Sequence, residues 1–218
     1  PKELNTGSAK ISESEAVEVA AYAKMTQPEP AAMQKLPAYR STEITGGNSD
    51  QFYDPASQKI LAEQLSQIIN TEGPIADTVL FRKVARAWGL ARTGRRIEEL
   101  LRSLLAATVI KTADKETTFY WPEFSQPEQW QEFRIADDTD GSRRQHSEVC
   151  LEELCNLAVY VLTQHGATSL SELARVICRL LHISRTTSDS ETRIKKCLAI
   201  YRLGRKIEID GDTVILRN

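Results

Sequence analysis

The chain has 218 residues, of which 41% are hydrophobic and 27% are charged. This length suits one large or two small folded domains, and the composition is typical of globular proteins. No apolar run approaches the length of a membrane span, so we expect no membrane partner. The net charge of −2 excludes little, but residues 1–56 carry −3, 57–121 carry +3, 122–147 carry −3 and 148–218 carry +1. An acidic spacer therefore separates two neutral or basic blocks.

Residues 1–51 have the composition of a linker. They are acidic, rich in serine and threonine, and place three prolines within residues 28–37. One stretch, residues 14–25, has small and apolar residues at helical spacing and predicts a short helix. The polar opening after Pro1 leads us to expect a piece of a longer protein.

Residues 52–122 predict a winged helix-turn-helix module. A first helix is expected after the stretch "DP", which supplies a favourable N-cap and a proline at the first helical position. A second helix is expected at 77–89 and a third at about 94–107, each with an apolar stripe at helical spacing. Alternation within 109–121 then predicts a two-stranded hairpin. Three helices followed by a hairpin are the layout of a winged helix.

Residues 147–218 repeat this pattern. Placing 80–93 over 173–186 aligns apolar, basic and turn positions, including "ART" with "SRT". Four residues, 187–190, are then inserted, so the offset of 93 becomes 97. A closing Asp-Gly turn favours a second hairpin. We therefore predict a mainly α-helical chain with small β-hairpins, built as tandem winged helix-turn-helix modules joined by an acidic connector at 123–146.

The third helix of such a module enters the major groove, so its outer face should be basic. In the first module four arginines lie on or just before this helix. They are the candidate phosphate contacts Arg92, Arg95, Arg96 and Arg102. Glu98 and Glu99 share the outer side and oppose phosphate binding, because affinity comes largely from neutralising backbone charge. The charge pattern of the first module's third helix therefore favours DNA binding less clearly than a uniformly basic face would.

The corresponding region of the second module is more uniformly basic. From residue 175 to residue 206 the sequence holds 9 basic and 2 acidic side chains. The candidate phosphate contacts here are Arg185, Arg193, Lys195, Lys196, Arg202, Arg205 and Lys206. We expect this surface to bind nucleic acid, with a solvated helix face or a protein-binding surface as the alternative.

Aromatic residues gather around the end of the first module and in the connector. They are Phe119, Tyr120, Trp121, Trp130 and Phe133. The alternation of the first three favours packing in the core or between modules. Stacking on bases at the tip of a wing is the alternative.

The sequence offers no self-contained catalytic site. It has no glycine-rich phosphate loop, no paired carboxylates in an apolar setting, and no nucleophile beside a base. Its cysteines lack the C-x-x-C spacing of a zinc site, and no histidine lies at ligand spacing from them. They are Cys150, Cys155, Cys178 and Cys197. We therefore expect no catalysis, no metal, no cofactor, and free thiols in a cytoplasmic compartment.

The stretch "EGPIADTVLFRKVARAWGLARTGRRIEELL" resembles the uncharacterised C-terminal domain of very large bacterial superfamily I helicases. The resemblance covers mainly residues 52–105, and "PEPAAMQKLPAYR" is similar to the connector before that domain. Such proteins usually carry a Vsr-like, restriction-type endonuclease domain just before it, and some are associated with phage defence. The residues that carry the resemblance are Glu72, Gly73, Pro74, Arg82, Val84, Ala85, Gly89, Leu90, Arg92, Gly94, Arg96 and Ile97. The resemblance implies the C-terminal piece of a helicase-nuclease, and it supplies no catalytic residues.

These observations predict a non-catalytic nucleic-acid-binding module of a bacterial DNA helicase or nuclease. Its partners would be duplex or single-stranded DNA and the remaining domains of the parent helicase. The alternative is a protein-interaction or dimerisation module that docks on the helicase core or on another partner. A sequence-specific transcription regulator is a third reading, which the acidic residues on the first module's third helix disfavour.

Overall fold

The computed structural model describes residues 36–139, 141–201 and 207–217. Among these residues are six α-helices and two small antiparallel sheets, which confirms the expectation of a mainly helical chain with small hairpins. None of the helices in this part of the chain is long and apolar enough to cross a membrane. The short helix expected at 14–25 lies outside the described residues.

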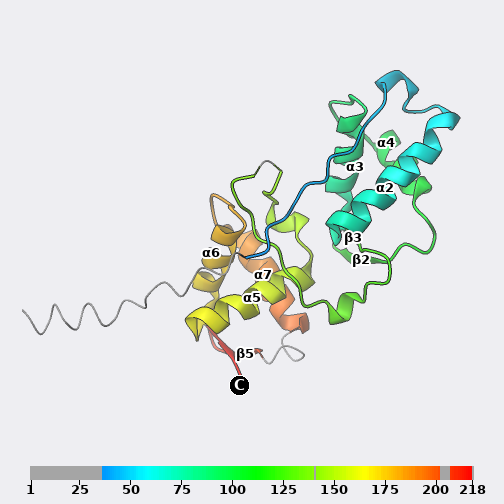
Figure 1. The fold of residues 1–218 in the computed structure, drawn as a ribbon. Coiled ribbons are helices and arrows are strands. Elements are labelled where there is room, and N and C mark those ends of the chain that lie inside the picture. Colours follow the sequence, from blue (N-terminus) through cyan, green and yellow to red (C-terminus); the bar gives the residue numbers. More distant parts are fainter. Residues whose placement is uncertain (1–35, 140, 202–206, 218) are drawn as a thin grey trace, which may run out of the picture. The chain divides into compact units, whose positions relative to one another are not determined.

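The first module forms a three-helix group beside a three-stranded sheet (Figure 1). Its strand order is β1-β3-β2, so the hairpin gains a strand from the segment between the first two helices. The sequence pattern did not predict β1, because a strand of two residues has no readable alternation. The elements are α2 (Gln58–Glu72), β1 (Ile75–Ala76), α3 (Asp77–Ala87), α4 (Arg95–Leu104), β2 (Lys111–Asp114) and β3 (Thr117–Tyr120).

The second module has the same order of elements and the same sheet topology. Its strand order is β4-β6-β5, which matches β1-β3-β2 strand for strand. The internal repeat in the sequence is therefore a repeat in the backbone. The elements are α5 (Leu151–His165), β4 (Thr168–Ser169), α6 (Leu170–Leu180), α7 (Ser188–Tyr201), β5 (Ile207–Asp210) and β6 (Thr213–Leu216).

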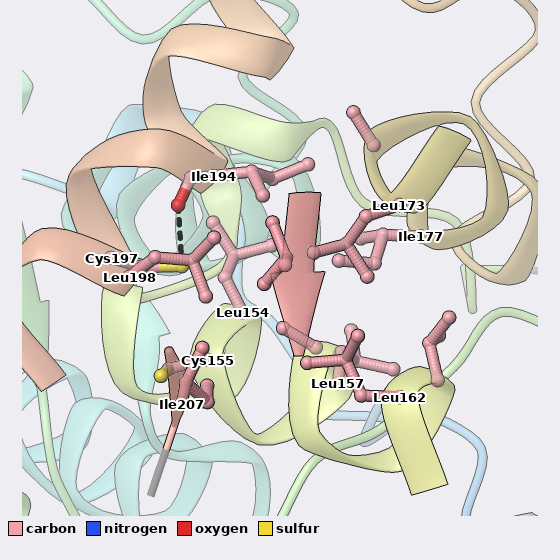
Figure 2. Close-up of a cluster of buried hydrophobic side chains, with 14 of the residues drawn as sticks. Leu154, Cys155, Leu157, Leu162, Leu173, Ile177, Ile194, Cys197, Leu198 and Ile207 are labelled. Atoms are coloured by element: carbon pink, nitrogen blue, oxygen red, sulfur yellow. Dashed lines mark hydrogen bonds between the residues drawn. The ribbon is translucent and has the colours of Figure 1, made fainter. Parts of the chain in front are cut away.

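Each module has its own hydrophobic core. In the first, Leu61 and Leu65 of α2 pack with Leu80 of α3 and Leu101 of α4, and all four are fully buried. In the second, apolar residues of α5, α6 and α7 are buried in one cluster that also includes Ile207 of β5, beside Cys155 (Figure 2). Burial of such side chains contributes about 1.5–3 kcal/mol each, so each module has a core to stabilise it.

One predicted helix end is close to the observed one, and another is wrong. Helix α3 ends at Ala87, and Gly89 follows its C-cap with φ +77°, so the predicted glycine stop is present two residues after the last helical residue. The third helix was expected to run over 94–107, but it ends at Leu104 because Leu105 is extended. In the second module Thr187 caps α7, since its backbone N–H and side chain both bond to Ser190.

The described parts of the segments expected to be linkers are packed. We call residues 37–51 the strap, and it belongs to the same compact unit as both modules. Tyr39 in the strap is 2% exposed, and Ala38 pairs with Ile135 of the connector in a parallel bridge. The linker predicted at 1–51 therefore includes a structured portion.

Five side chains from the strap, the connector, α2 and α5 form a buried polar group, the connector cluster. Arg134 and Arg144 both pair with the carboxylate of Glu153, at 2.9 and 2.7 Å. Both guanidinium groups also lie over the ring of Tyr39, whose hydroxyl donates to Glu72 at 2.5 Å. The acidic composition of the connector concealed these two arginines, which bind inside the protein.

The electrostatics of the connector cluster follow from its burial. Burial alone would raise the pKa of Glu153, but the charges and hydrogen bonds of Arg134 and Arg144 lower it to about 2. Burial and the neighbouring Glu72 raise the pKa of Tyr39, so its hydroxyl stays protonated and donates. Glu153 is therefore a charged group in the interior, held by two cations.

Candidate nucleic-acid interface

Helix α4 presents one apolar side and one charged side. Ile97 and Leu101 are buried in the first module's core, while Arg95 and Arg102 are exposed. The spacing of three to four residues between the apolar positions produces this division. The helix begins after Gly94, which offers no side-chain cap to the first backbone N–H groups.

All four predicted arginines of the first module are exposed. Arg95 pairs with Glu99 at 2.7 Å, a solvent-exposed contact between residues four apart. Arg96 lies 4.2 Å from the ring centroid of Tyr53, and Arg102 donates to Asp77 at 3.1 Å. The Arg95–Glu99 pair is exposed, so it holds the guanidinium only weakly. Arg102 is exposed but is the ion-pair partner of Asp77, whose side chain is buried.

Beside α4, an open hollow of about 450 Å³ lies between α3 and the turn that precedes α4. We call it the arginine hollow. Its walls are Thr78, Arg82, Arg86, Ala91, Arg92, Thr93 and Glu98. Of these, only Arg92 was predicted as a site residue. Arg82 and Arg86 were not predicted, because a helix-turn-helix directs the search for phosphate contacts to its third helix. Their signal in the sequence is the recurrence of Thr78, Arg82 and Arg86 every four residues along α3.

The structure places the predicted residues of α7 differently. Arg193 is only 8% exposed, and its guanidinium pairs with Asp114 of the first module's hairpin. It also donates to the carbonyl of Val149 at 2.5 Å. Lys196 pairs with the same Asp114 carboxylate. As a correction to the sequence expectation, Arg193 is not a free phosphate contact and Lys196 is already engaged, because both bind a carboxylate inside the protein.

The remaining candidates of the second module divide into two groups. Arg185 and Lys195 are exposed, Arg185 in the turn before α7 and Lys195 on the helix. Arg202, Arg205 and Lys206 lie outside the described residues. The described part of α7 thus offers fewer exposed cations than its sequence indicates.

An apolar contact accompanies the ion pairs of α7. Ala76, Phe119 and Trp121 of the first module are buried in one cluster with Cys150, which precedes α5. Trp121 also meets Trp130 of the connector edge-on, with the ring centroids 5.4 Å apart. We call this contact, together with Asp114, Arg193 and Lys196, the seam. The aromatic residues at 119–121 therefore pack internally, the role favoured by their alternation.

A second hollow, of about 520 Å³, is lined mostly by apolar side chains. It lies between α2 and the segment that follows α4, and Leu105, Val109 and Phe124 are among its walls. Phe124 is 87% exposed and adopts φ +64°. A large apolar side chain exposed at the edge of a groove is a feature of protein-contact surfaces.

The described residues contain no group of three or more histidine, cysteine or acidic side chains that could hold a metal ion. All four cysteines are buried, and none forms a disulfide. Burial raises the pKa of the Cys150 and Cys197 thiols, which disfavours the reactive thiolate.

The family model of a protein of unknown function, DUF3320, matches residues 50–99. No curated protein and no solved structure matches the chain. The matched segment contains every residue that lines the arginine hollow, together with Arg95 and Arg96.

Proposed function

We propose that this chain is a non-catalytic nucleic-acid-binding module built from two winged helices. Its first module holds the phosphate backbone through arginines of α3, α4 and the turn between them. The observation that carries the proposal is the exposure of five arginines on these adjoining elements: Arg86, Arg92, Arg95, Arg96 and Arg102. Guanidinium groups donate in a planar fork that matches phosphate oxygens, so an exposed cluster of them favours this ligand.

The repeated order of helices and strands supports the winged-helix interpretation. In each module, a short strand after the first helix pairs with the last strand of the hairpin. The two helices joined by a turn, α3 and α4, are arranged in sequence as in a helix-turn-helix, whose second helix enters the major groove. Lys195 and Arg185 of the second module would add outlying contacts.

The parent protein in this proposal is a bacterial DNA helicase with a nuclease domain, and the module retains DNA for it in the cytoplasm. The match of residues 50–99 to a family of unknown function is compatible with this context. The resemblance of "EGPIADTVLFRKVARAWGLARTGRRIEELL" to the end of such helicases supports it. Free cysteines are expected in a reducing compartment.

Fluorescence anisotropy with labelled duplex and single-stranded DNA, each at two salt concentrations, tests the proposal. We expect micromolar or tighter binding that weakens steeply with salt, because bound phosphates release counterions. The double substitution Arg95→Gln/Arg96→Gln should weaken binding about 10-fold on any DNA sequence. Absence of binding by the wild type at low salt would contradict the proposal.

A protein-docking module is the second candidate, and the apolar hollow beside Phe124 favours it. Its partner would be the remainder of the parent helicase. The substitution Phe124→Ala separates the two functions, since it removes an exposed apolar side chain and no charge. Loss of helicase binding with DNA affinity unchanged would assign docking to this hollow.

A further inference from the structure

We propose that the arginine hollow is a binding site for a single phosphate group of a nucleic-acid strand. The inference rests on the proposed function and assigns one subsite within it. The site lies between α3 and the turn before α4, apart from the exposed ends of Arg95 and Arg102. Its ligand is an internal phosphodiester, and a terminal phosphate is the other source of the same chemistry.

The donors come from two elements that converge on the hollow. Helix α3 contributes Thr78, Arg82 and Arg86, whose spacing of four residues places them along one stripe of the helix. The following turn contributes Arg92 and Thr93. Three arginines and two threonines therefore line one space, and their guanidinium and hydroxyl groups can all donate hydrogen bonds to oxygen.

These donors are differently occupied. Arg86 and Arg92 are exposed and form no ion pair with another described residue. Arg82 is half-buried and donates to Glu148 at 2.9 Å through one guanidinium nitrogen, which fixes its position and leaves other N–H groups of its fork. The hollow therefore has one arginine held in place, Arg82, and two exposed arginines, Arg86 and Arg92, that can bind an anion.

The charge and shape of the hollow select the ligand. Glu98 is the acidic residue of the lining, so the walls carry three positive charges and one negative. Apart from Ala91, the lining side chains are polar or charged, which disfavours an apolar occupant. The hollow is open to solvent, since Thr78, Arg86 and Arg92 are exposed. An open site allows a strand to enter and leave on either side of one phosphodiester.

Glu98 provides a test in which a substitution is expected to increase DNA affinity. Glu98 lines the same space as the arginines, and its negative charge opposes an anion there. Glu98→Gln should therefore tighten DNA binding about 3-fold. Arg86→Gln/Arg92→Gln should weaken DNA binding about 10-fold, and the slope of log affinity against log salt concentration should fall by the equivalent of about one to two neutralised phosphates. The matched control is Lys59→Gln/Lys111→Gln, which removes two exposed positive charges outside the hollow.

The experiment measures the affinity of the full chain for three DNA probes by anisotropy. They are a linear strand with a 5′-phosphate, the same strand with a 5′-hydroxyl, and a circular single strand. We expect Arg86→Gln/Arg92→Gln to lose equal affinity on all three, which assigns an internal phosphodiester. A loss confined to the 5′-phosphorylated strand overturns that assignment in favour of a terminal phosphate.

Two outcomes separate this inference from the proposed function. If the wild type binds DNA, but Arg86→Gln/Arg92→Gln weakens binding no more than Lys59→Gln/Lys111→Gln, the subsite is overturned and the proposed function stands. If the wild type binds none of the probes at low salt, both are overturned. A Glu98→Gln variant that binds DNA as the wild type does would also contradict the site.

Discussion

Arg96 on α4 and Arg193 on α7 occupy equivalent positions of the internal repeat, yet their surroundings differ. Arg96 is exposed and lies 4.2 Å from the ring centroid of Tyr53 in its own module. Arg193 is buried, pairs with Asp114, and lies 6.0 Å from the ring centroid of Phe119 in the other module. The same residue type thus serves as a surface cation in one copy and as an internal bond between copies in the other. What packs on the helix decides which role the arginine takes.

The basic side chains of the protein therefore fall into two classes, the exposed cations and the internally paired cations. Arg86, Arg92 and Arg96 are open to an external anion. Arg134, Arg144 and Arg193 already have internal carboxylates as partners. Three predictions test how strict this division is.

The largest expected effect concerns stability. Arg193→Ala should lower the free energy of unfolding by about 3–5 kcal/mol, because it leaves the buried Asp114 carboxylate with only part of its compensation. The equivalent substitution Arg96→Ala should cost no more than about 1 kcal/mol, since an exposed guanidinium over a ring contributes little. Urea denaturation of both variants measures the contrast. Equal losses would abolish the distinction between the two positions.

Acid should remove the contribution of the internal ion pairs of Glu153 to stability. The ordinary pKa of 4.5 for Glu153 falls to about 2 in the folded state, so its contribution to stability is complete above pH 4.5. That contribution, roughly 3 kcal/mol, should disappear as the pH falls from about 4.5 towards 2. Denaturation at a series of pH values measures it. Glu153→Gln should start less stable and decline less steeply over this window, and an unchanged slope would contradict the role assigned to Glu153.

The smallest expected effect is the conversion of an internally paired cation into an exposed one. Asp114→Asn removes the carboxylate that pairs with Lys196, so this partly exposed cation of α7 becomes available, whereas Arg193 stays buried. DNA affinity should rise about 3-fold, with a steeper dependence on salt. Glu116→Gln is the matched control, because it removes one exposed negative charge from the same hairpin. An equal gain in affinity in both variants would reflect net charge alone and would contradict a role of the α7 cations in DNA binding.

Periodic features were predictable from the sequence, and contacts between distant segments were not. The apolar stripes that predicted the helices reappear as core positions, such as Leu65 and Leu101. The strands Ile75–Ala76 and Thr168–Ser169 were missed because two residues carry no periodic signal. Helical projection placed Arg193 on an outer face, but it contains no information about Asp114, which lies 79 residues earlier.

The candidate site was predicted in part for the same reason. Arg92, Arg95, Arg96 and Arg102 were identified from their place around the third helix, and all are exposed. Arg82 and Arg86 belong to the preceding helix, and only the folded chain brings them to the same hollow as Arg92. The internal role of Arg134 was hidden by the net negative charge of the segment around it.

The strap is held by several contacts between Tyr39 and Gly46, and these restrict its length. At one end Tyr39 donates to Glu72, and at the other Gly46 passes so close to the end of α3 that an added Cβ would lie 1.6 Å from the carbonyl oxygen of Ala87. Between them Thr45 accepts a hydrogen bond from Gln64 at 2.6 Å. Surface segments usually tolerate insertions, but one added residue between Tyr39 and Gly46 must bulge outward or release an anchor. The spacing between these two residues should therefore resist insertion and deletion during evolution more strongly than their surface position indicates.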